Sequence, residues 1–520
     1  MKRILSLSIC FAACFLLNVS AQEIKTPEVR IQYPDIPLIK RKAQSPLVCL
    51  KLFVSEPRKD DAIQGIRAAI NRDVSQFEHL IIYTNGSESD FDTNFPGVNF
   101  VPVAGTMTIP VSIPLKQGWN YIWIAASLKE NADMDAMPSV EILSLNGNGG
   151  KQYPIAAATG SPAKRIGTAL RLAGEDQIHT YRIPGIAQTD KGTLIAVYDN
   201  RYSKSGDLPG NIDVGMSRST DGGKTWEPMK VIMDMGEPHE NNGIGDPTVL
   251  FDPATKTIWV AALWSKGNRS IAGSEPGLSP DESGQFVLVS SRDDGLTWSA
   301  PYNITAQVKN PRWHIYFNGP GSGIVMADGT LVFPSQYWDE SKKPGMPHSS
   351  IIYSKDHGKT WHSGVGAKRN TTESQVVETT PGTLMLNMRD NRGLFRSVAT
   401  TTDLGKTWHE HPTSYSALPD PICMASIIKA SVRLKGEMKD VLFFSNVNMS
   451  SVEHSRKNMT VKASLDLGET WQPAHQLLLD ERYCYGYSSL TRIDEKTIGI
   501  LYEGRGDLFF MRIPVTAVLR

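Results

Sequence analysis

Residues 219–226 read STDGGKTW, and the pattern S/T-x-D-x-G-x-T-W returns four more times along the 520-residue chain. Successive copies start 72, 63, 47 and 63 residues apart, at Ser219, Ser291, Ser354, Thr401 and Ser464. Five fixed positions in five copies define an internal repeat. Repeats of about 50–70 residues that each end in a hairpin are typical of β-propeller blades, in which each sheet covers its neighbour.

The repeated motif has a mechanical interpretation. Its aspartate can accept hydrogen bonds from the amides of its own turn, its glycine permits a positive φ, and its tryptophan can tuck under the hairpin. We therefore expect the five aspartates to be structural and not catalytic. An EF-hand type of calcium loop needs oxygen ligands at alternating positions and a late glutamate, which no copy provides.

The first third of the chain contains short alternating segments rich in β-branched and aromatic residues. Such segments, broken by Gly, Pro and Asn, predict a β-sandwich with strands at 47–54, 79–85, 98–105, 107–113, 119–128 and 139–145. Trp119, Tyr121 and Trp123 share one face at period two. That stripe suits either the sandwich core or stacking on sugar rings, and we favour the core.

The sequence pattern divides the chain into three parts. Residues 1–21 have a basic start, an apolar run too short for the roughly 20 residues of a spanning helix, and a small-residue ending at Ala21, which indicates a cleaved secretory signal. Residues 22–160 form the N-terminal β-sandwich, entered through a flexible segment at 22–46 and left through a linker at 156–165. Residues 161–520 form the repeat domain.

Composition excludes several classes of function. The 54 basic residues balance 54 acidic ones, so no general attraction for nucleic acid or an anionic membrane is expected. Without the signal, only Cys49, Cys423 and Cys484 remain, which is too few for a disulfide framework. Metal-ligand spacings and phosphate-binding loops are missing, so we predict no cofactor and no metal.

The sequence resembles the exo-α-sialidases (neuraminidases) of the bacterial and animal type. The resemblance rests on YRIP at 181–184, on Asp207 in the loop SGDLPG and on the five Asp-box motifs, and it covers roughly residues 165–520. It implies an all-β fold with a six-bladed β-propeller as the catalytic domain. Secreted bacterial enzymes with an additional N-terminal β domain are the most similar in organisation.

Fixed cations are expected, because a sialic acid carries a carboxylate on its anomeric carbon. Guanidinium groups can bind that carboxylate through two hydrogen bonds and stay charged at any working pH. The resemblance implies three such arginines, Arg182 in YRIP, Arg389 in LNMRD and Arg456 in HSRKNM. It also implies that Glu503 in ILYEG orients Arg182.

The resemblance assigns the chemistry to three further residues. Asp207 matches the acid/base, Tyr487 in YGYSSL the nucleophile, and Glu373 in TTESQ the partner of that tyrosine. Periodicity alone cannot choose among Tyr483, Tyr485 and Tyr487, because they alternate along the chain. The resemblance chooses the last of the three, which is followed directly by Ser-Ser-Leu.

Four more residues complete the predicted pocket. The resemblance implies that Arg201 lies near O4 of the sugar and that Asp246 in GIGDPTV lies on the O4 or N-acetyl side. Trp264 and Gln336 are predicted pocket walls.

The resulting hypothesis is a secreted, periplasmic or extracellular retaining exo-α-sialidase that acts as a monomer. Its substrates would be terminal sialic acids of glycoproteins, glycolipids or oligosaccharides, and the N-terminal domain could bind carbohydrate. A trans-sialidase, or an enzyme that forms an anhydro product, is an alternative within the same chemistry. A non-catalytic sialic-acid lectin is an alternative from another class. A lectin would need only the arginines, whereas this sequence also has Asp207, Glu373 and Tyr487.

Overall fold

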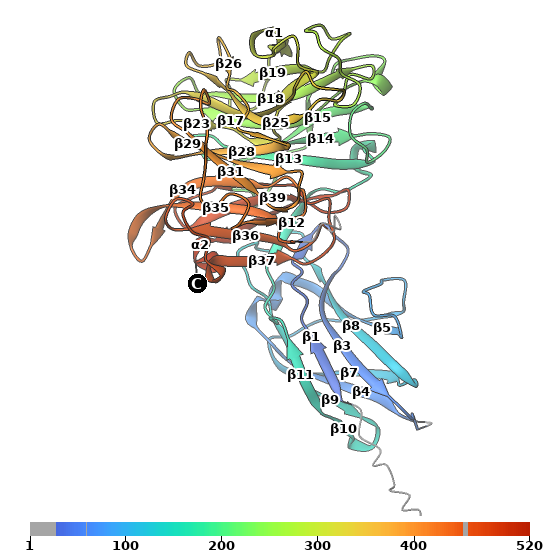
Figure 1. The fold of residues 1–520 in the computed structure, drawn as a ribbon. Helices are drawn as coiled ribbons and strands as arrows, with labels where there is room; N and C mark the ends of the chain where they lie inside the picture. Colours follow the sequence, from blue (N-terminus) through green and yellow to red (C-terminus); the bar gives the residue numbers. More distant parts are fainter. Residues whose placement is uncertain (1–27, 59, 451–455, 520) are drawn as a thin grey trace, which may run out of the picture.

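The computed structural model describes residues 28–519 except 59 and 451–455, and the regular secondary structure of this part of the chain is almost entirely strand (Figure 1). The predicted signal at 1–21 lies outside the described residues. The two α-helices found in this part of the chain, α1 (Thr305–Val308) and α2 (Val515–Val518), are single turns. Among the described residues, no helix is long and apolar enough to cross a membrane.

Two sheets form the N-terminal part of the fold. The six-stranded sheet has the order β11 (Ile155–Thr159), β1 (Val29–Gln32), β3 (Ser45–Val54), β8 (Gly118–Leu128), β5 (Phe77–Gly86) and β6 (Gly97–Phe100). The four-stranded sheet has the order β10 (Gln152–Tyr153), β9 (Val140–Gly147), β4 (Ala62–Ile70) and β7 (Gly105–Pro114). Leu50 and Ile122 of the first sheet share one buried apolar cluster with Ile66 and Ile142 of the second, which makes the pair a sandwich.

The aromatic stripe of β8 lies outside the sandwich core, so our preference for a core position was wrong. Ile122 and Ile124 face the second sheet, and the alternation of a strand therefore turns the three aromatic residues to the outer face. Trp123 is buried there beneath other aromatic side chains, whereas Trp119 is 40% exposed.

Two segments expected to be irregular contain strands. The entry segment 22–46 includes β1 and also β2 (Leu38–Lys40), and the linker 156–165 overlaps β11. β1 pairs in parallel with β11, and β2 pairs in parallel with β12 (Ile166–Arg171). The backbone of both segments is therefore held by neighbouring strands that are distant in sequence, which local composition does not reveal.

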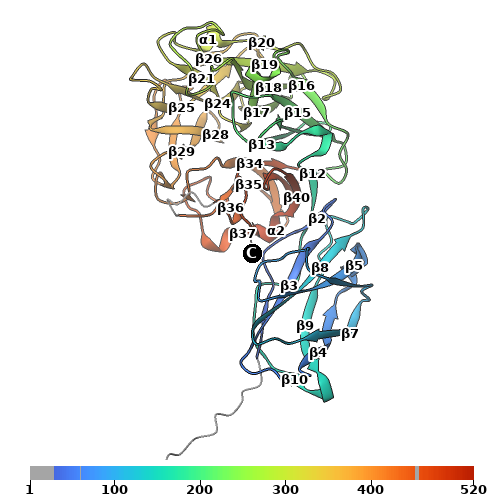
Figure 2. The ribbon, with the colours of Figure 1, turned by 90° about the vertical axis from the view of Figure 1, so that its right-hand side faces the viewer.

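Six sheets of four to six strands follow and are arranged in a ring (Figure 2). The first contains β13 (Thr180–Gln188), β14 (Leu194–Arg201), β15 (Ile212–Ser219) and β16 (Lys230–Met233). The second contains β17 (Asn242–Asp252), β18 (Thr257–Lys266), β19 (Gln285–Ser291), β20 (Tyr302–Asn303) and β22 (Gly321–Ser322). The third contains β21 (Ile315–Asn318), β23 (Ile324–Val325), β24 (Leu331–Trp338), β25 (Pro347–Ser354), β26 (His362–Ser363) and β27 (Lys368–Arg369).

The other three sheets complete the set. The fourth contains β28 (Thr371–Thr380), β29 (Thr383–Asp390), β31 (Ser397–Thr401) and β32 (His409–Glu410), with a separate pair made by β30 (Leu394–Phe395) and β33 (Pro419–Asp420). The fifth contains β34 (Ser426–Leu434), β35 (Glu437–Val447), β36 (Met459–Ser464) and β37 (Gln476–Asp480). The sixth joins β38 (Ser488–Arg492), β39 (Thr497–Glu503) and β40 (Leu508–Pro514) to β12 and β2.

The five Asp boxes have one geometry. In every copy the aspartate accepts a hydrogen bond of 2.9–3.0 Å from the main-chain N–H of the threonine four residues after it, as Asp221 does from Thr225. The glycine N–H donates to the first hydroxyl of the motif at 2.8–3.0 Å. The prediction that these aspartates staple their own turns is confirmed.

The box glycines also allow neighbouring sheets to approach closely. Gly223 has φ +87, and a Cβ there would lie 2.1 Å from the ring of Phe510 in the sixth sheet. Gly358 has φ +84, and a Cβ there would lie 2.4 Å from Trp259 in the second sheet. Any side chain at these positions would push two sheets apart, which explains why the motif repeats with glycine in this place.

The N-terminal sandwich is attached to the ring through its sixth sheet. Besides the pairing of β2 with β12, Lys42 Nζ lies 2.7 Å from Asp507 Oδ2. Arg512 Nε donates to Asp135 at 2.9 Å. These contacts join side chains that are hundreds of residues apart in sequence and fix the sandwich against one side of the ring (Figure 2).

Candidate active site

The residues of the candidate site gather at one end of the ring because of the strand directions. The first strand of each sheet begins at this end, and the second strand, which is antiparallel, finishes there. Arg182 therefore lies near the start of β13 and Arg201 at the end of β14. Tyr487 directly precedes β38, and Glu503 ends β39.

Irregular pairing turns several of these side chains inward. The register shifts between Arg182 and Gly185 in β13, between Gly245 and Thr248 in β17, and between Thr371 and Ser374 in β28. The first shift adjoins Arg182, the second includes Asp246 and the third includes Glu373, all of which are predicted site residues. β-Bulges are frequent beside active sites because they redirect a side chain without ending the strand.

A cavity of about 400 Å³ opens at this end of the ring. Six of the predicted residues line it, namely Asp207, Asp246, Gln336, Glu373, Arg389 and Tyr487. The other predicted residues that contact this group are Arg182, Arg201, Arg456 and Glu503.

Tyr487 lies at the centre of a charged hydrogen-bond network. Its hydroxyl donates to Glu373 Oε1, while Arg389 Nη1 lies 2.6 Å from Glu373 Oε2 and donates to the Tyr487 hydroxyl at 3.1 Å. Burial first, and then the Glu373 carboxylate, raise the pKa of Tyr487 well above its ordinary value, although nearby guanidinium groups act against the shift. The phenol is therefore neutral at neutral pH and has a proton acceptor in contact with it.

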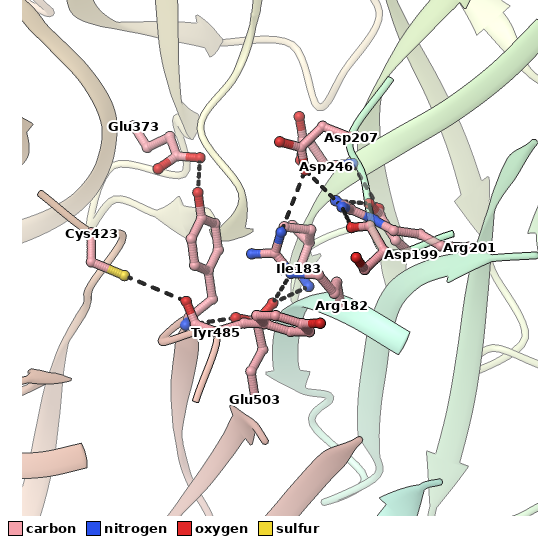
Figure 3. Close-up of polar contacts among 12 residues, drawn as sticks. Arg182, Ile183, Asp199, Arg201, Asp207, Asp246, Glu373, Cys423, Tyr485 and Glu503 are labelled. Atoms are coloured by element: carbon pink, nitrogen blue, oxygen red, sulfur yellow. Dashed lines mark hydrogen bonds and ion pairs between the residues drawn. The ribbon is translucent and has the colours of Figure 1, made fainter. Parts of the chain in front are cut away.

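Arg182 is paired with Glu503, as the resemblance implies. Its Nε donates to Glu503 Oε1 at 3.0 Å, and the main-chain N–H of Tyr487 donates to Glu503 Oε2 at 2.9 Å (Figure 3). The Arg182 guanidinium also lies over the rings of Tyr485 and Tyr487, with its Cζ 4.9 Å and 5.2 Å from the two centroids. Tyr485 thus supports an arginine and does not point at Glu373.

Arg456 belongs to the same group of cations. Its Nη1 donates to the Tyr485 carbonyl at 2.7 Å and its Nη2 to the Ile422 carbonyl at 3.2 Å, while its Cζ lies 5.8 Å from the Tyr487 ring centroid. The structure therefore brings the three predicted arginines together around one phenol.

Asp207 faces two guanidinium groups across the mouth of the cavity (Figure 3). Its Oδ1 lies 2.7 Å from Arg201 Nη1 and 3.4 Å from Arg182 Nη1, although 73% of the side chain remains exposed. Partial loss of solvent around the carboxyl, which faces the cavity although most of the side chain is exposed, acts to raise the pKa of Asp207. Arg201 and then Arg182 outweigh this effect and hold the pKa below the ordinary value. Asp207 is therefore ionised in the unliganded protein at neutral pH.

Asp246 is more enclosed than Asp207. Burial raises its pKa well above the ordinary value, and the carboxylates of Asp199 and Asp207 raise it further, against the effect of Arg201. Asp199 was missed in the sequence, because an aspartate inside a strand gives no motif signal. It lies behind Arg201 and Asp246 and contacts both.

Trp264 does not line the cavity, and its prediction as a pocket wall needs correction. Its Nε1 donates to Asn242 Oδ1 at 2.8 Å, and its ring packs between the first two sheets. Because side chains alternate along β18, the preceding residue, Leu263, faces the cavity instead.

An apolar wall of the cavity was also missed. Phe317 and Trp338 stack with ring centroids 5.8 Å apart, and Leu208 and Leu263 pack against them. Trp338 is the last residue of β24, which places it where the second strand of every sheet finishes. Arg201 and Glu503 also lie where the second strand of a sheet finishes, so the same reasoning from strand direction could have found Trp338.

The chemistry of this site suits an anionic sugar. Fixed guanidinium groups can bind a carboxylate, a neutral phenol beside a carboxylate can become a nucleophile, and a second carboxyl stands across the cavity for proton transfer. A ring of sheets with such a site at its strand ends defines a glycosidase for acidic sugars.

Comparison with known proteins agrees with that class. The family model of the BNR repeat-like domain matches residues 192–501. A sialidase of Bacteroides fragilis is 41% identical over 95% of this chain and 95% of its own length. The solved structure of the Hadza microbial sialidase Hz136 has a TM-score of 0.86 and 38% identity, covering 94% of this chain and all of that one.

The chain belongs to the sialidase family, and it is a glycoside hydrolase with exo-α-sialidase activity. Its Asp boxes correspond to the repeats of the matched family model. The intramolecular trans-sialidase of Ruminococcus gnavus is more distant, with 18% identity and a TM-score of 0.57 over 67% of this chain, and it shares the fold alone.

Proposed function

We propose that this sialidase releases terminal sialic acid from glycoproteins, glycolipids and oligosaccharides by double displacement, with Tyr487 as the nucleophile. The observation that carries the proposal is the hydrogen bond from the Tyr487 hydroxyl to Glu373, made within reach of Arg389. A lectin would need the arginines but has no use for a buried phenol that contacts a proton acceptor.

In the first step, the Tyr487 oxygen forms a bond to the anomeric carbon while the glycosidic C–O bond breaks. The phenolic proton passes to Glu373, and the departing oxygen takes a proton from Asp207. In the second step, Asp207 removes a proton from water, the water oxygen bonds to the anomeric carbon, and Tyr487 leaves and regains its proton from Glu373. Two inversions at one carbon give net retention.

A phenol is a suitable nucleophile for this substrate. The anomeric carbon of a sialic acid carries a carboxylate, and a second carboxylate approaching it would be repelled. Tyrosine nucleophiles are a known exception to the two-carboxylate rule of glycosidases. Arg182, Arg389 and Arg456 would bind the substrate carboxylate, and Arg201 and Asp246 would contact the opposite side of the sugar.

Export of the protein is part of the proposal. The signal pattern of residues 1–21 supports cleavage near Ala21 and a secreted, periplasmic or extracellular location. All of the candidate site residues come from one chain, which is compatible with activity as a monomer.

The N-terminal sandwich is proposed as a carbohydrate-binding domain. Trp119 is 40% exposed, lies 5.3 Å from the Phe53 ring and 6.1 Å from the Tyr121 ring, and borders a groove with Arg30 and Lys51. Exposed aromatic rings can stack on sugars, and the two cations would favour acidic ones. The full-length Trp119→Ala variant should bind a sialylated glycoprotein more weakly than the unaltered protein does. Titration calorimetry measures both affinities.

The reaction itself is tested with α2,3- and α2,6-sialyllactose, followed by proton NMR from the first minute. The proposal predicts free sialic acid whose first-formed anomer is α. A β anomer formed first would contradict retention, an anhydro sugar would indicate the intramolecular reaction, and sialic acid moved to added lactose would indicate transfer.

A further inference from the structure

Arg396 is a fully buried cation that the proposed mechanism does not use. It directly precedes β31, and 0% of its surface is exposed. Its Nη1 lies 3.7 Å from the carboxylate oxygen Oδ2 of Asp420, which is too long for a hydrogen bond. Burial lowers the pKa of Arg396 and nearby Arg389 lowers it further, although Asp420 opposes both. A charge buried in this way is costly unless hydrogen bonds compensate for the lost water.

Two nitrogens of Arg396 bind the strand that carries Arg389. Nε donates to Asn387 Oδ1 at 2.8 Å, and Nη2 donates to the main-chain carbonyl of Asn387 at 3.3 Å. Asn387 and Arg389 are two positions apart in β29, so their side chains point to the same face of the sheet. The buried guanidinium therefore fixes β29 beside the base of the Arg389 side chain.

The third nitrogen of Arg396 binds a loop that contacts Arg456. Nη1 donates to the Cys423 carbonyl, and the N–H of Cys423 donates to Asp420 Oδ1 at 2.8 Å. Between these two residues Ile422 has φ 62, a left-handed conformation in which a β-branched residue is strained. The carbonyl of Ile422 accepts the hydrogen bond of 3.2 Å from Arg456 Nη2. Arg396 and Asp420 thus hold the strained loop that gives Arg456 one of its acceptors.

The separate strand pair of β30 and β33 places Arg396 next to this loop. Leu394 of β30 pairs with Asp420 of β33, and the main-chain N–H of Arg396 donates to the Leu418 carbonyl at 2.9 Å. The pair is distinct from the fourth sheet, to which β29 and β31 belong. It therefore brings the segment with Arg396 and the segment with Asp420 together beside that sheet.

We propose that Arg396 is a positioning residue that holds Arg389 and Arg456 in the convergent arrangement that binds the substrate carboxylate. Converging guanidinium groups repel one another, so their directions have to be fixed by the surrounding structure. One guanidinium with its donors in a rigid fork can bind β29 and the 420–423 loop at once, which the compact ammonium of a lysine cannot do. The inference rests on the proposed function and extends it to a residue that does not touch the substrate.

The test compares two inhibitors that differ only in charge at C1, 2-deoxy-2,3-didehydro-sialic acid and its carboxamide. Arg396→Met removes the guanidinium but keeps an unbranched side chain. It should raise the Ki of the acid about 10- to 100-fold, the factor expected for weakened hydrogen bonds to a charged group. The Ki of the carboxamide should be similar in the variant and in the unaltered protein, so the ratio of the two Ki values should fall.

Arg396→Lys separates positioning from charge. It keeps the cation and its attraction to Asp420, but a lysine cannot bind both segments, so the preference for the acid should still fall. Full retention of that preference by Arg396→Lys would overturn the inference, because the charge alone would then account for the effect. This variant also carries the test if Arg396→Met does not fold.

Arg171→Met is the matched control. Arg171 is a buried arginine of β12 whose Nη1 lies 3.9 Å from the nearby carboxylate of Asp176. It donates to the hydroxyls of Tyr198 at 2.8 Å and Ser217 at 2.6 Å, and none of these residues lines the cavity. Its loss should lower the melting temperature and leave the ratio of the two Ki values unchanged.

The inference is overturned if Arg396→Met weakens both inhibitors equally, or if Arg171→Met changes the Ki ratio to the same extent, because the effect would then be general destabilisation. If the unaltered protein bound the acid no better than the carboxamide, the proposed binding of the carboxylate by the arginines would itself be refuted. The two failures are therefore distinguishable.

Discussion

The Tyr487 hydroxyl donates a hydrogen bond to Glu373, although the two residues are 114 positions apart and belong to different sheets of the ring. Arg389 Nη1 contacts both, at 3.1 Å from the phenol and 2.6 Å from the carboxylate. One arginine thus stabilises the pair and remains near the position proposed for the substrate carboxylate. Substitutions in this network should affect catalysis more than folding.

Arg389→Ala should remove about 2–5 kcal/mol of binding to the sugar carboxylate, the usual cost of breaking a desolvated charge pair. The kcat/KM for an aryl sialoside measures this loss. Arg433→Ala is the control. Arg433 is exposed, lies near the end of β34 that is distant from the site, and is paired with Glu495, so its substitution should leave activity unchanged. Near-native activity of a folded Arg389→Ala protein would refute the carboxylate-binding role.

Asp207→Ala should impair substrates with poor leaving groups much more than aryl sialosides. A phenolate departs without a proton, whereas a sugar alkoxide needs one from the acid. Rates for sialyllactose and a nitrophenyl sialoside, measured on the same preparation, give the comparison. Equal losses on both substrates would mean that Asp207 has a role other than proton donation.

The pH dependence should follow Asp207 as well. The proposed acid must be protonated, and Arg201 and Arg182 hold its pKa below the ordinary value in the free protein. The kcat/KM for sialyllactose should therefore fall as pH rises above that depressed pKa. A bound substrate carboxylate would offset the charge of Arg182, one of these two guanidinium groups, so the corresponding fall in kcat should lie at higher pH. A fall in kcat/KM that persists unchanged in Asp207→Ala would assign it to another group.

Glu503→Gln should destabilise the fold and reduce activity together. The two oxygens of Glu503 accept from Arg182 Nε and Ile183 N–H on one side and from Tyr487 N–H on the other. An amide would set a donor against one of these donors and leave Arg182 without its buried counter-charge, at a cost of about 3–5 kcal/mol. Calorimetric unfolding at one pH should show a lower melting temperature. An unchanged melting temperature would contradict the buried pairing.

Removal of residues 1–162 should reduce stability while leaving the site residues in place. The deletion takes away β2 from the sixth sheet, the Lys42–Asp507 ion pair and the Asp135 contact of Arg512. The remaining protein should unfold at a lower temperature than the full chain but, while folded, still cleave a small aryl sialoside. A folded but inactive product would show that the sandwich contributes to the reaction.

Much of the fold was predictable because its signals are local. The Asp-box spacing indicated the repeating sheets, and alternation in 47–54 and 119–128 matched β3 and β8. β1 and β2 were missed because each pairs with a strand more than a hundred residues away, β1 with β11 and β2 with β12, and local composition does not show such pairing.

The site was predictable where a motif marks it and not where packing decides. Arg182, Asp207 and Tyr487 stand in short motifs and do meet in space. Trp264 was misplaced because its sequence gives no information about which face of β18 turns to the cavity. Asp199 was missed because its contact with the main chain of Asp246 exists only once β14 and β17 are adjacent.

The central claim is that Tyr487 is the nucleophile, and a fluorinated sialosyl inactivator tests it most directly. The protein is inactivated with a 2,3-difluorosialic acid and digested, and the labelled peptide is sequenced by tandem mass spectrometry, with Tyr487→Phe treated in parallel. The account predicts one sialosyl group on Tyr487 and none on the phenylalanine variant, which should have lost most turnover and kept its fold. A label on Tyr483, Tyr485 or a carboxylate, or retained turnover in Tyr487→Phe, would contradict it.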